Sequence, residues 1–183
     1  VGSVVYTQLL NSRGGIECDL TVTRIDHDRF LLVTGTAFGA HDLAWLRRHL
    51  APDDAVQIRD VSSSMACFGL WGPRAREVLA AATRDDVSDE AFGWMRARPI
   101  TVGSAPCIVL RVTYVGELGW ELYPPSEVGV HVWDTLMSAG EPHGITAAGY
   151  RAIDSLRIEK GYRAWGADIT PEAAERPRVT LGF

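Results

Sequence analysis

Short β-type segments alternate with amphipathic helical segments along this chain, and this alternation constrains the fold more than any other feature. Apolar runs and two-residue alternation predict strands at 4–10, 16–25, 30–34, 57–61, 66–71, 108–113 and 119–123. Apolar residues at helical spacing predict helices at 39–50, 73–82, 126–139 and 146–161, the last two capped by Ser126 and Thr146. This alternation indicates an α/β or an α+β fold, and of the two we predict the α+β class, with antiparallel or mixed sheets.

The pattern divides the chain into two halves, each a hairpin followed by a helix. We expect a first half at residues 1–64 and a second half at 65–183, with their sheets facing each other across a central cleft. Strand-like segments open and close the chain, at residues 1–6 and 176–183. Natural domains rarely begin and end in this way, so we expect a fragment of a longer protein.

Composition narrows the class of protein. Of the 183 residues, 46% are hydrophobic and 22% are charged, values that exclude disorder for the bulk of the chain. No apolar run in the sequence approaches the ~20 residues that a membrane-spanning helix needs. The net charge of −5 argues against partners such as nucleic acid or an anionic membrane.

The cysteines and histidines predict neither a disulfide framework nor a metal site. Cys18, Cys67 and Cys107 are widely spaced and form no CxxC motif, and the five histidines include no close pair beyond ordinary helix spacing. Reduced cysteines fit a cytosolic or mitochondrial-matrix-like compartment, and we predict a cytoplasmic protein.

A first polar cluster lies in the second predicted strand. The two-residue period of a strand places Asp19, Thr21 and Thr23 on one face. On spacing alone, a row of carboxylate and hydroxyl groups is most simply a solvent-exposed face of an antiparallel sheet. Gly14 and Gly15 precede this strand and allow a ligand to approach the backbone closely, which keeps a binding site open as the alternative.

A second cluster combines two glycines, two carboxylates and three aromatic residues within residues 113–123. Trp120 and Leu122 share one strand face, and Glu121 and Tyr123 share the other. A carboxylate beside aromatic rings matches a heterocycle with two adjacent N–H donors, such as the N3–H and 2-amino group of a pterin. A hairpin turn with a surface glutamate is an equally good interpretation of these residues alone.

A third cluster lies in the last predicted helix and the segment after it. Arg151 and Asp154 are spaced to pair on the helix surface, where such pairs usually only support the helix. Arg157 is a further cation of the kind that binds the carboxylate tail of a folate-like ligand. Without the other two clusters, this helix indicates little about function.

Together the three clusters resemble the folate-binding aminomethyltransferase family, typified by the T-protein of the glycine cleavage system. The matching segments occur in the family's order: residues 6–7 with 10–11, 14–16 with 19–20, 72–73, 114–121 and 154–159. Residues 15–22, 114–121 and 159–168 are more similar to the folate domain of flavin-dependent dimethylglycine or sarcosine dehydrogenases and oxidases.

The resemblance implies a T-protein-like fold and a tetrahydrofolate site. Asp19 matches the family's catalytic aspartate, although Cys18 stands where the T-protein has a second aspartate. The residues that match cofactor-binding positions are Tyr6, Thr21, Tyr114, Glu121 and Arg157, and of these Tyr114 and Glu121 match the residues that hold the pterin. We expect the family's N-terminal stretch before Tyr6 and its C-terminal barrel domain to be missing from this chain.

The resemblance also implies an enzyme, an aminomethyltransferase-like protein that forms 5,10-methylenetetrahydrofolate. Its partners would be folate, an amine-derived one-carbon donor, and a lipoyl carrier protein or a flavin domain. FAD would bind only a separate domain, because the chain has no GxGxxG fingerprint. Two alternatives remain open: the folate domain of an amine-demethylating dehydrogenase or oxidase, and a folate-binding module without catalysis.

Overall fold

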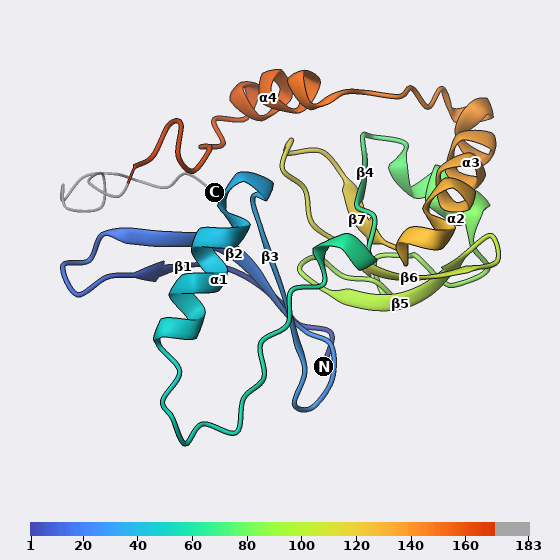
Figure 1. Ribbon diagram of the computed structural model, residues 1–183. Helices are drawn as coiled ribbons and strands as arrows, with labels where there is room; N and C mark the ends of the chain where they lie inside the picture. Colours follow the sequence, from blue (N-terminus) through green and yellow to red (C-terminus); the bar gives the residue numbers. More distant parts are fainter. Residues whose placement is uncertain (171–183) are drawn as a thin grey trace. The chain divides into compact units, whose positions relative to one another are not determined.

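The computed structural model describes residues 1–170 (Figure 1). Its strands are β1 (Val4–Leu10), β2 (Ile16–Arg24), β3 (Phe30–Thr34), β4 (Phe68–Trp71), β5 (Ala97–Val102), β6 (Ala105–Leu110) and β7 (Gly119–Tyr123). Its α-helices are α1 (Gly39–Arg48), α2 (Ala75–Ala82), α3 (Gly129–Gly140) and α4 (Tyr150–Glu159). Among these residues, no helix has the length and apolarity required to cross a lipid bilayer. The strand-like segment expected at 176–183 lies outside the described residues.

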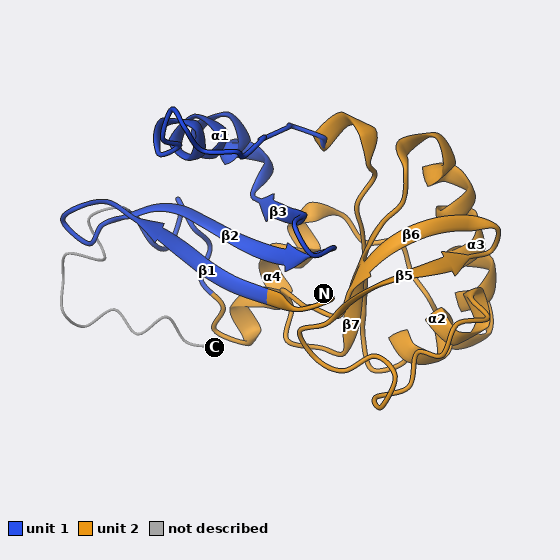
Figure 2. Ribbon diagram, turned by 90° about the horizontal axis from the view of Figure 1, so that it is seen from below, with its two compact units in different colours: residues 1, 5–61, 163–183 blue, residues 2–4, 62–162 orange. Residues whose placement is uncertain are grey.

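The elements belong to two compact units (Figure 2). Of the described residues, unit 1 holds 1, 5–61 and 163–170, and it carries a three-stranded sheet of order β1-β2-β3 together with α1. Unit 2 holds residues 2–4 and 62–162, and it carries a four-stranded sheet of order β4-β7-β6-β5 with α2, α3 and α4. Both sheets are antiparallel, which confirms the predicted α+β class.

A tight turn joins β1 to β2 in unit 1. The backbone amide of Asn11 donates to the Gly15 carbonyl at 2.8 Å, and the Asn11 side-chain oxygen accepts from the Gly15 amide at 2.9 Å. Gly14 has a φ of 80°, which a residue without a side chain adopts at little cost. Along β2, alternate residues such as Cys18 and Leu20 are buried, so the intervening Asp19 lies on the opposite face.

The core of unit 2 lies on one face of its sheet. Trp120 and Leu122 are fully buried and belong to one apolar cluster with Leu79 of α2 and Val132 of α3. Burial of these apolar side chains is the main stabilising contribution available to a small unit. Because side chains alternate along β7, the remaining face of this strand carries Glu121 and its neighbours.

Most strand predictions hold, one is wrong, one is displaced along the chain, and one strand was not predicted. The strands at 4–10, 30–34 and 119–123 are confirmed to the residue. The strand predicted at 57–61 is wrong, since these residues have no regular structure and only Ile58 among them is not exposed. The sequence gives no sign of β5, whose Pro99 is unfavourable inside a sheet but acceptable here because β5 is an edge strand. The strand predicted at 108–113 lies three residues earlier, as β6.

The helix predictions are correct in number and type but not at every boundary. Ser126 does not cap α3: its hydroxyl donates to the Ser63 carbonyl at 2.9 Å, and a short 3₁₀ turn precedes the helix. Thr146 does not cap α4, which begins at Tyr150 after an extended Gly149. Local cap signals failed here because the side chains had alternative partners or lay too far from the first turn.

Candidate functional site

Asp19 occupies the middle of β2, and its carboxylate is held through one oxygen. Oδ1 accepts hydrogen bonds from the Tyr6 hydroxyl and from Nε2 of Gln8, the latter at 2.8 Å. Tyr6 and Gln8 are two residues apart in β1, so their side chains point to the same face. Within residues 1–170, no hydrogen bond reaches Oδ2 of Asp19. This oxygen is therefore available to accept a proton or a further hydrogen bond.

The rest of this strand face is not simply exposed to solvent. Thr21 is half-buried, and Thr23 has a relative exposure of 0%. The Thr23 hydroxyl has no hydrogen-bond partner among the described residues. The structure thus brings Tyr6 to Asp19, and it places Thr21 next along the same face without a contact that defines a role for it.

Glu121 lies on the other sheet, in β7, and its carboxyl is also held through one oxygen. Oε2 accepts a hydrogen bond from the Tyr123 hydroxyl at 2.5 Å. Desolvation raises the pKa of Glu121, and the hydrogen bond from Tyr123 lowers it. Within the described part of the chain, no cation forms an ion pair with this carboxyl. A ligand that presents N–H donors would therefore stabilise the ionised carboxyl.

Cys67 borders this carboxyl from the neighbouring strand. Phe68 pairs with Leu122, so Cys67, one residue earlier, lies opposite Tyr123. Although Cys67 as a residue is exposed, desolvation of the thiol and the charge of Glu121 raise its pKa to about 11. The thiol is therefore protonated near neutral pH and does not add a second negative charge.

The planar indole of Trp71 lies beside Glu121, and the sequence alone did not indicate Trp71 as a site residue. Gly69 is the cross-strand partner of Glu121, and a Cβ atom on Gly69 would lie 2.6 Å from the Trp71 ring. Nε1 of Trp71 donates to the Val112 carbonyl at 3.2 Å, which fixes the orientation of the indole. An aromatic face next to a carboxyl is a surface on which a planar heterocycle stacks. The signal in the sequence is the two-residue spacing of Gly69 and Trp71 in β4.

Tyr114 and Arg157 meet through Tyr162. The rings of Tyr114 and Tyr162 are stacked, with centroids 6.3 Å apart and an interplanar angle of 26°. Arg157 is only 5% exposed, and its Nη1 donates to the Tyr162 carbonyl at 2.9 Å while its Nε donates to Asp154 at 2.7 Å. Arg157 therefore fixes the segment after α4, and binding a ligand carboxylate would require it to exchange partners. Its assignment to a folate tail stays a prediction.

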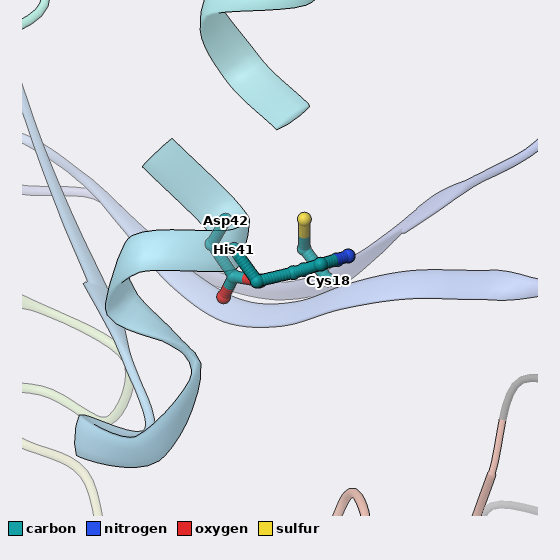
Figure 3. A group of neighbouring side chains, drawn as sticks. All are labelled: Cys18, His41 and Asp42. Carbon is teal, nitrogen blue, oxygen red and sulfur yellow. The ribbon is translucent and has the colours of Figure 1, made fainter. Parts of the chain in front are cut away.

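A separate group of Cys18, His41 and Asp42 lies where β2 meets the first turn of α1 (Figure 3). One potential ligand atom from each residue lies within 4.8 Å of the other two. The buried Asp42 carboxylate accepts from the Thr34 hydroxyl and lies 3.0 Å from Nδ1 of His41. Burial and Asp42 raise the pKa of Cys18 to about 12, so its thiol is protonated near neutral pH. The Thr34 hydroxyl and Nδ1 of His41 thus give Asp42 hydrogen-bond partners within the chain, and the expected absence of a metal site stays a prediction.

Comparison with known proteins gives a consistent relationship. The sequence matches the family model described as GCVT N-terminal domain over residues 1–176. It is 44% identical over 167 residues to 4-methylaminobutanoate oxidase (formaldehyde-forming) of Paenarthrobacter nicotinovorans, covering 91% of this chain and 20% of that protein. It is 35% identical over 170 residues to mitochondrial dimethylglycine dehydrogenase of Homo sapiens, covering 92% and 20%. The chain thus spans about a fifth of the length of these relatives.

The fold is also similar to a solved structure. The crystal structure of glycine cleavage system aminomethyltransferase T from Bartonella henselae superposes with a TM-score of 0.79 and 31% sequence identity. The alignment covers 94% of this chain and 44% of that one. This likeness confirms the T-protein-like fold that the sequence predicted.

Proposed function

This chain belongs to the family of the GCVT N-terminal domain, and from that membership we propose that it takes part in tetrahydrofolate-dependent one-carbon transfer that yields 5,10-methylenetetrahydrofolate. The family comprises folate-dependent aminomethyltransferases and the folate domains of dimethylglycine and sarcosine dehydrogenases. The observation that carries the proposal is the Asp19 carboxylate, which Tyr6 and Gln8 hold at Oδ1 while Oδ2 stays open. A general base needs this combination of fixed orientation and an accessible oxygen.

The residues of unit 2 fit a pterin. Glu121 accepts one hydroxyl at Oε2, and within residues 1–170 no hydrogen bond reaches its Oε1. Since this carboxyl is partly buried and no cation of the described residues pairs with it, a ligand that brings its own N–H donors is favoured, because these donors stabilise the ionised form. The indole of Trp71 offers an apolar face for a planar heterocycle, and Tyr114, whose ring stacks on Tyr162, matches a residue that holds the pterin in the family. We therefore assign Glu121 and Tyr114 to pterin binding.

Each residue has a separate task in the proposed reaction. When bound, tetrahydrofolate would supply a nucleophilic nitrogen that takes up the carbon of an amine-derived donor, while the donor's nitrogen leaves as an amine or ammonia. Asp19 stabilises the positive charge that develops at this nitrogen and accepts the released proton at Oδ2. Tyr6 and Gln8 keep the carboxylate in one orientation throughout, since both donate to Oδ1. Glu121 binds and orients the ligand, and it takes no part in proton transfer.

The one-carbon donor distinguishes two versions of this function. The likeness to a formaldehyde-forming oxidase and to dimethylglycine dehydrogenase favours a carbon released by oxidation of an N-methylamine. In that version, FAD binds a separate domain of the protein. The likeness to aminomethyltransferase T favours an aminomethyl group on a lipoyl carrier protein instead.

One experiment tests the function and separates the two versions. The full-length protein is supplied with tetrahydrofolate and either an N-methylamine such as dimethylglycine or an aminomethyl-lipoyl carrier protein, and methylenetetrahydrofolate is measured. Product from one donor identifies the version. Tight binding of tetrahydrofolate without product from either donor would contradict the transferase and favour the non-catalytic module.

A further inference from the structure

Tyr123 is a buried tyrosine to which the proposed function assigns no task. It lies two residues after Glu121 in β7, so the two side chains share the sheet face opposite the core residues Trp120 and Leu122. Its relative exposure is 6%, and its hydroxyl donates to Oε2 of Glu121 at 2.5 Å. A buried hydroxyl needs a hydrogen-bond partner, and the Tyr123 hydroxyl has the Glu121 carboxyl, which the proposed function assigns to the pterin.

The surroundings make this hydrogen bond the main stabilisation of the ionised carboxyl. The groups that titrate beside Glu121 are the Tyr123 hydroxyl on its own strand and the Cys67 thiol next to β4. Both groups are neutral near pH 7, because burial and the Glu121 charge raise the pKa of each. A carboxylate that is partly buried without a cation depends on neutral donors.

We infer that Tyr123 is a positioning residue for folate binding, which fixes Oε2 of Glu121 and thereby directs Oε1 toward the N–H donors of the ligand. This inference rests on the proposed function, in which Glu121 holds the pterin. The terminal torsion of a glutamate side chain is broad, so a free carboxyl would lose this orientation. Because β7 already orders Tyr123, its hydroxyl holds Oε2 of Glu121 with little further loss of side-chain entropy.

The inference predicts a dependence on pH. Burial raises the pKa of Glu121, and the Tyr123 hydrogen bond opposes that rise. In Tyr123→Phe the opposing hydrogen bond is lost, so the pKa of Glu121 rises further and a smaller fraction is ionised at neutral pH. Affinity for tetrahydrofolate should therefore fall at neutral pH and recover as the pH increases.

The first measurement is calorimetric titration of the full-length protein with tetrahydrofolate between pH 6 and pH 9. Tyr123→Phe should bind about 10-fold more weakly at pH 7, the effect of one hydrogen bond to a charged group. Tyr150→Phe is the matched control, since Tyr150 lies on α4 with a relative exposure of 80%, and its affinity should equal that of the wild type. In a Glu121→Gln background, Tyr123→Phe should have no pH-dependent effect.

The second measurement needs no ligand. A carboxyl whose pKa is raised on folding destabilises the protein progressively as the pH rises from its ordinary value through the folded value. Thermal unfolding should show this decline in the wild type, extended to higher pH in Tyr123→Phe and absent in Glu121→Gln.

The outcomes separate the inference from the function on which it rests. Unchanged affinity of Tyr123→Phe at every pH, or the same loss in the Glu121→Gln background, would overturn the positioning role. Wild-type affinity of Glu121→Gln would instead remove Glu121 from the pterin site. In that case the unfolding profiles would still decide whether Tyr123 controls the ionisation of Glu121.

Discussion

Replacing Asp19 with asparagine tests the catalytic proposal directly, because the structure indicates that the fold should survive. The asparagine side-chain oxygen can take the place of Oδ1 and accept from Tyr6 and Gln8, while its amide group takes the place of Oδ2. Two hydrogen bonds to a charged acceptor become bonds to a neutral one, and each weakens by about 1 kcal/mol. The free energy of unfolding should therefore fall by about 1–3 kcal/mol, including the effect of the changed group at Oδ2.

The effect on the reaction should be larger than the effect on stability. The variant has a donor where the wild type has an acceptor, so no group can take the proton at that position. Loss of a general base lowers the rate by roughly 10²–10⁴, which corresponds to about 3–5 kcal/mol in the barrier. Affinity for tetrahydrofolate should change much less, because the loss concerns the transition state.

The assay is single-turnover formation of methylenetetrahydrofolate by the full-length protein, with the bound ligand measured separately. Asp28→Asn is the matched control, since Asp28 is exposed in the turn between β2 and β3 and should leave the rate unchanged. A rate for Asp19→Asn within threefold of the wild type would refute the assignment. A collapse of affinity without a change in the rate of the bound complex would favour a binding module.

Three further changes test the binding surface and the sheet beneath it. Glu121→Gln should weaken tetrahydrofolate binding by about 1.5–3 kcal/mol, measured by calorimetry, because the ligand's N–H donors lose a charged acceptor. Gly69→Ala places a Cβ 2.6 Å from the Trp71 ring, so the indole must move; we expect weaker folate binding with a smaller change in melting temperature. Gly119→Ala places a Cβ 2.2 Å from the Leu70 carbonyl, which belongs to the backbone, and should lower the free energy of unfolding by about 1–3 kcal/mol in denaturant titrations.

The sequence predicted those strands whose pattern is complete within a few residues. The segment at 119–123 alternates between the core and the opposite face, and it is a strand at those residues. The segment at 57–61 has a similar local pattern but forms no strand, because a strand also needs a neighbour to pair with and local alternation does not report one. The edge strand β5 was missed for the converse reason, since pairing with β6 outweighs the effect of Pro99.

The candidate site, like the strands, was predicted only in part. Asp19 and Glu121 were assigned through family resemblance, and their roles stay proposals. Their partners could not be assigned, because Gln8 reaches Asp19 across a hairpin whose register the sequence leaves open. The two-residue spacing of Tyr123 from Glu121 was visible, but only the structure shows a donor at 2.5 Å.

Asp19 and Glu121 are held in the same way, and neither carboxylate forms an ion pair with a cation of residues 1–170. In each, neutral donors occupy one oxygen, and among residues 1–170 the other oxygen accepts no hydrogen bond. An arginine or lysine would orient a carboxylate as firmly, but it would also neutralise the charge that has to stabilise a cationic nitrogen or attract N–H donors. Hydroxyl and amide donors fix the geometry and preserve that charge. A lysine introduced at Gln8 should therefore reduce the reaction rate even where it forms an ion pair with Asp19, because the pair would satisfy the carboxylate before the substrate does.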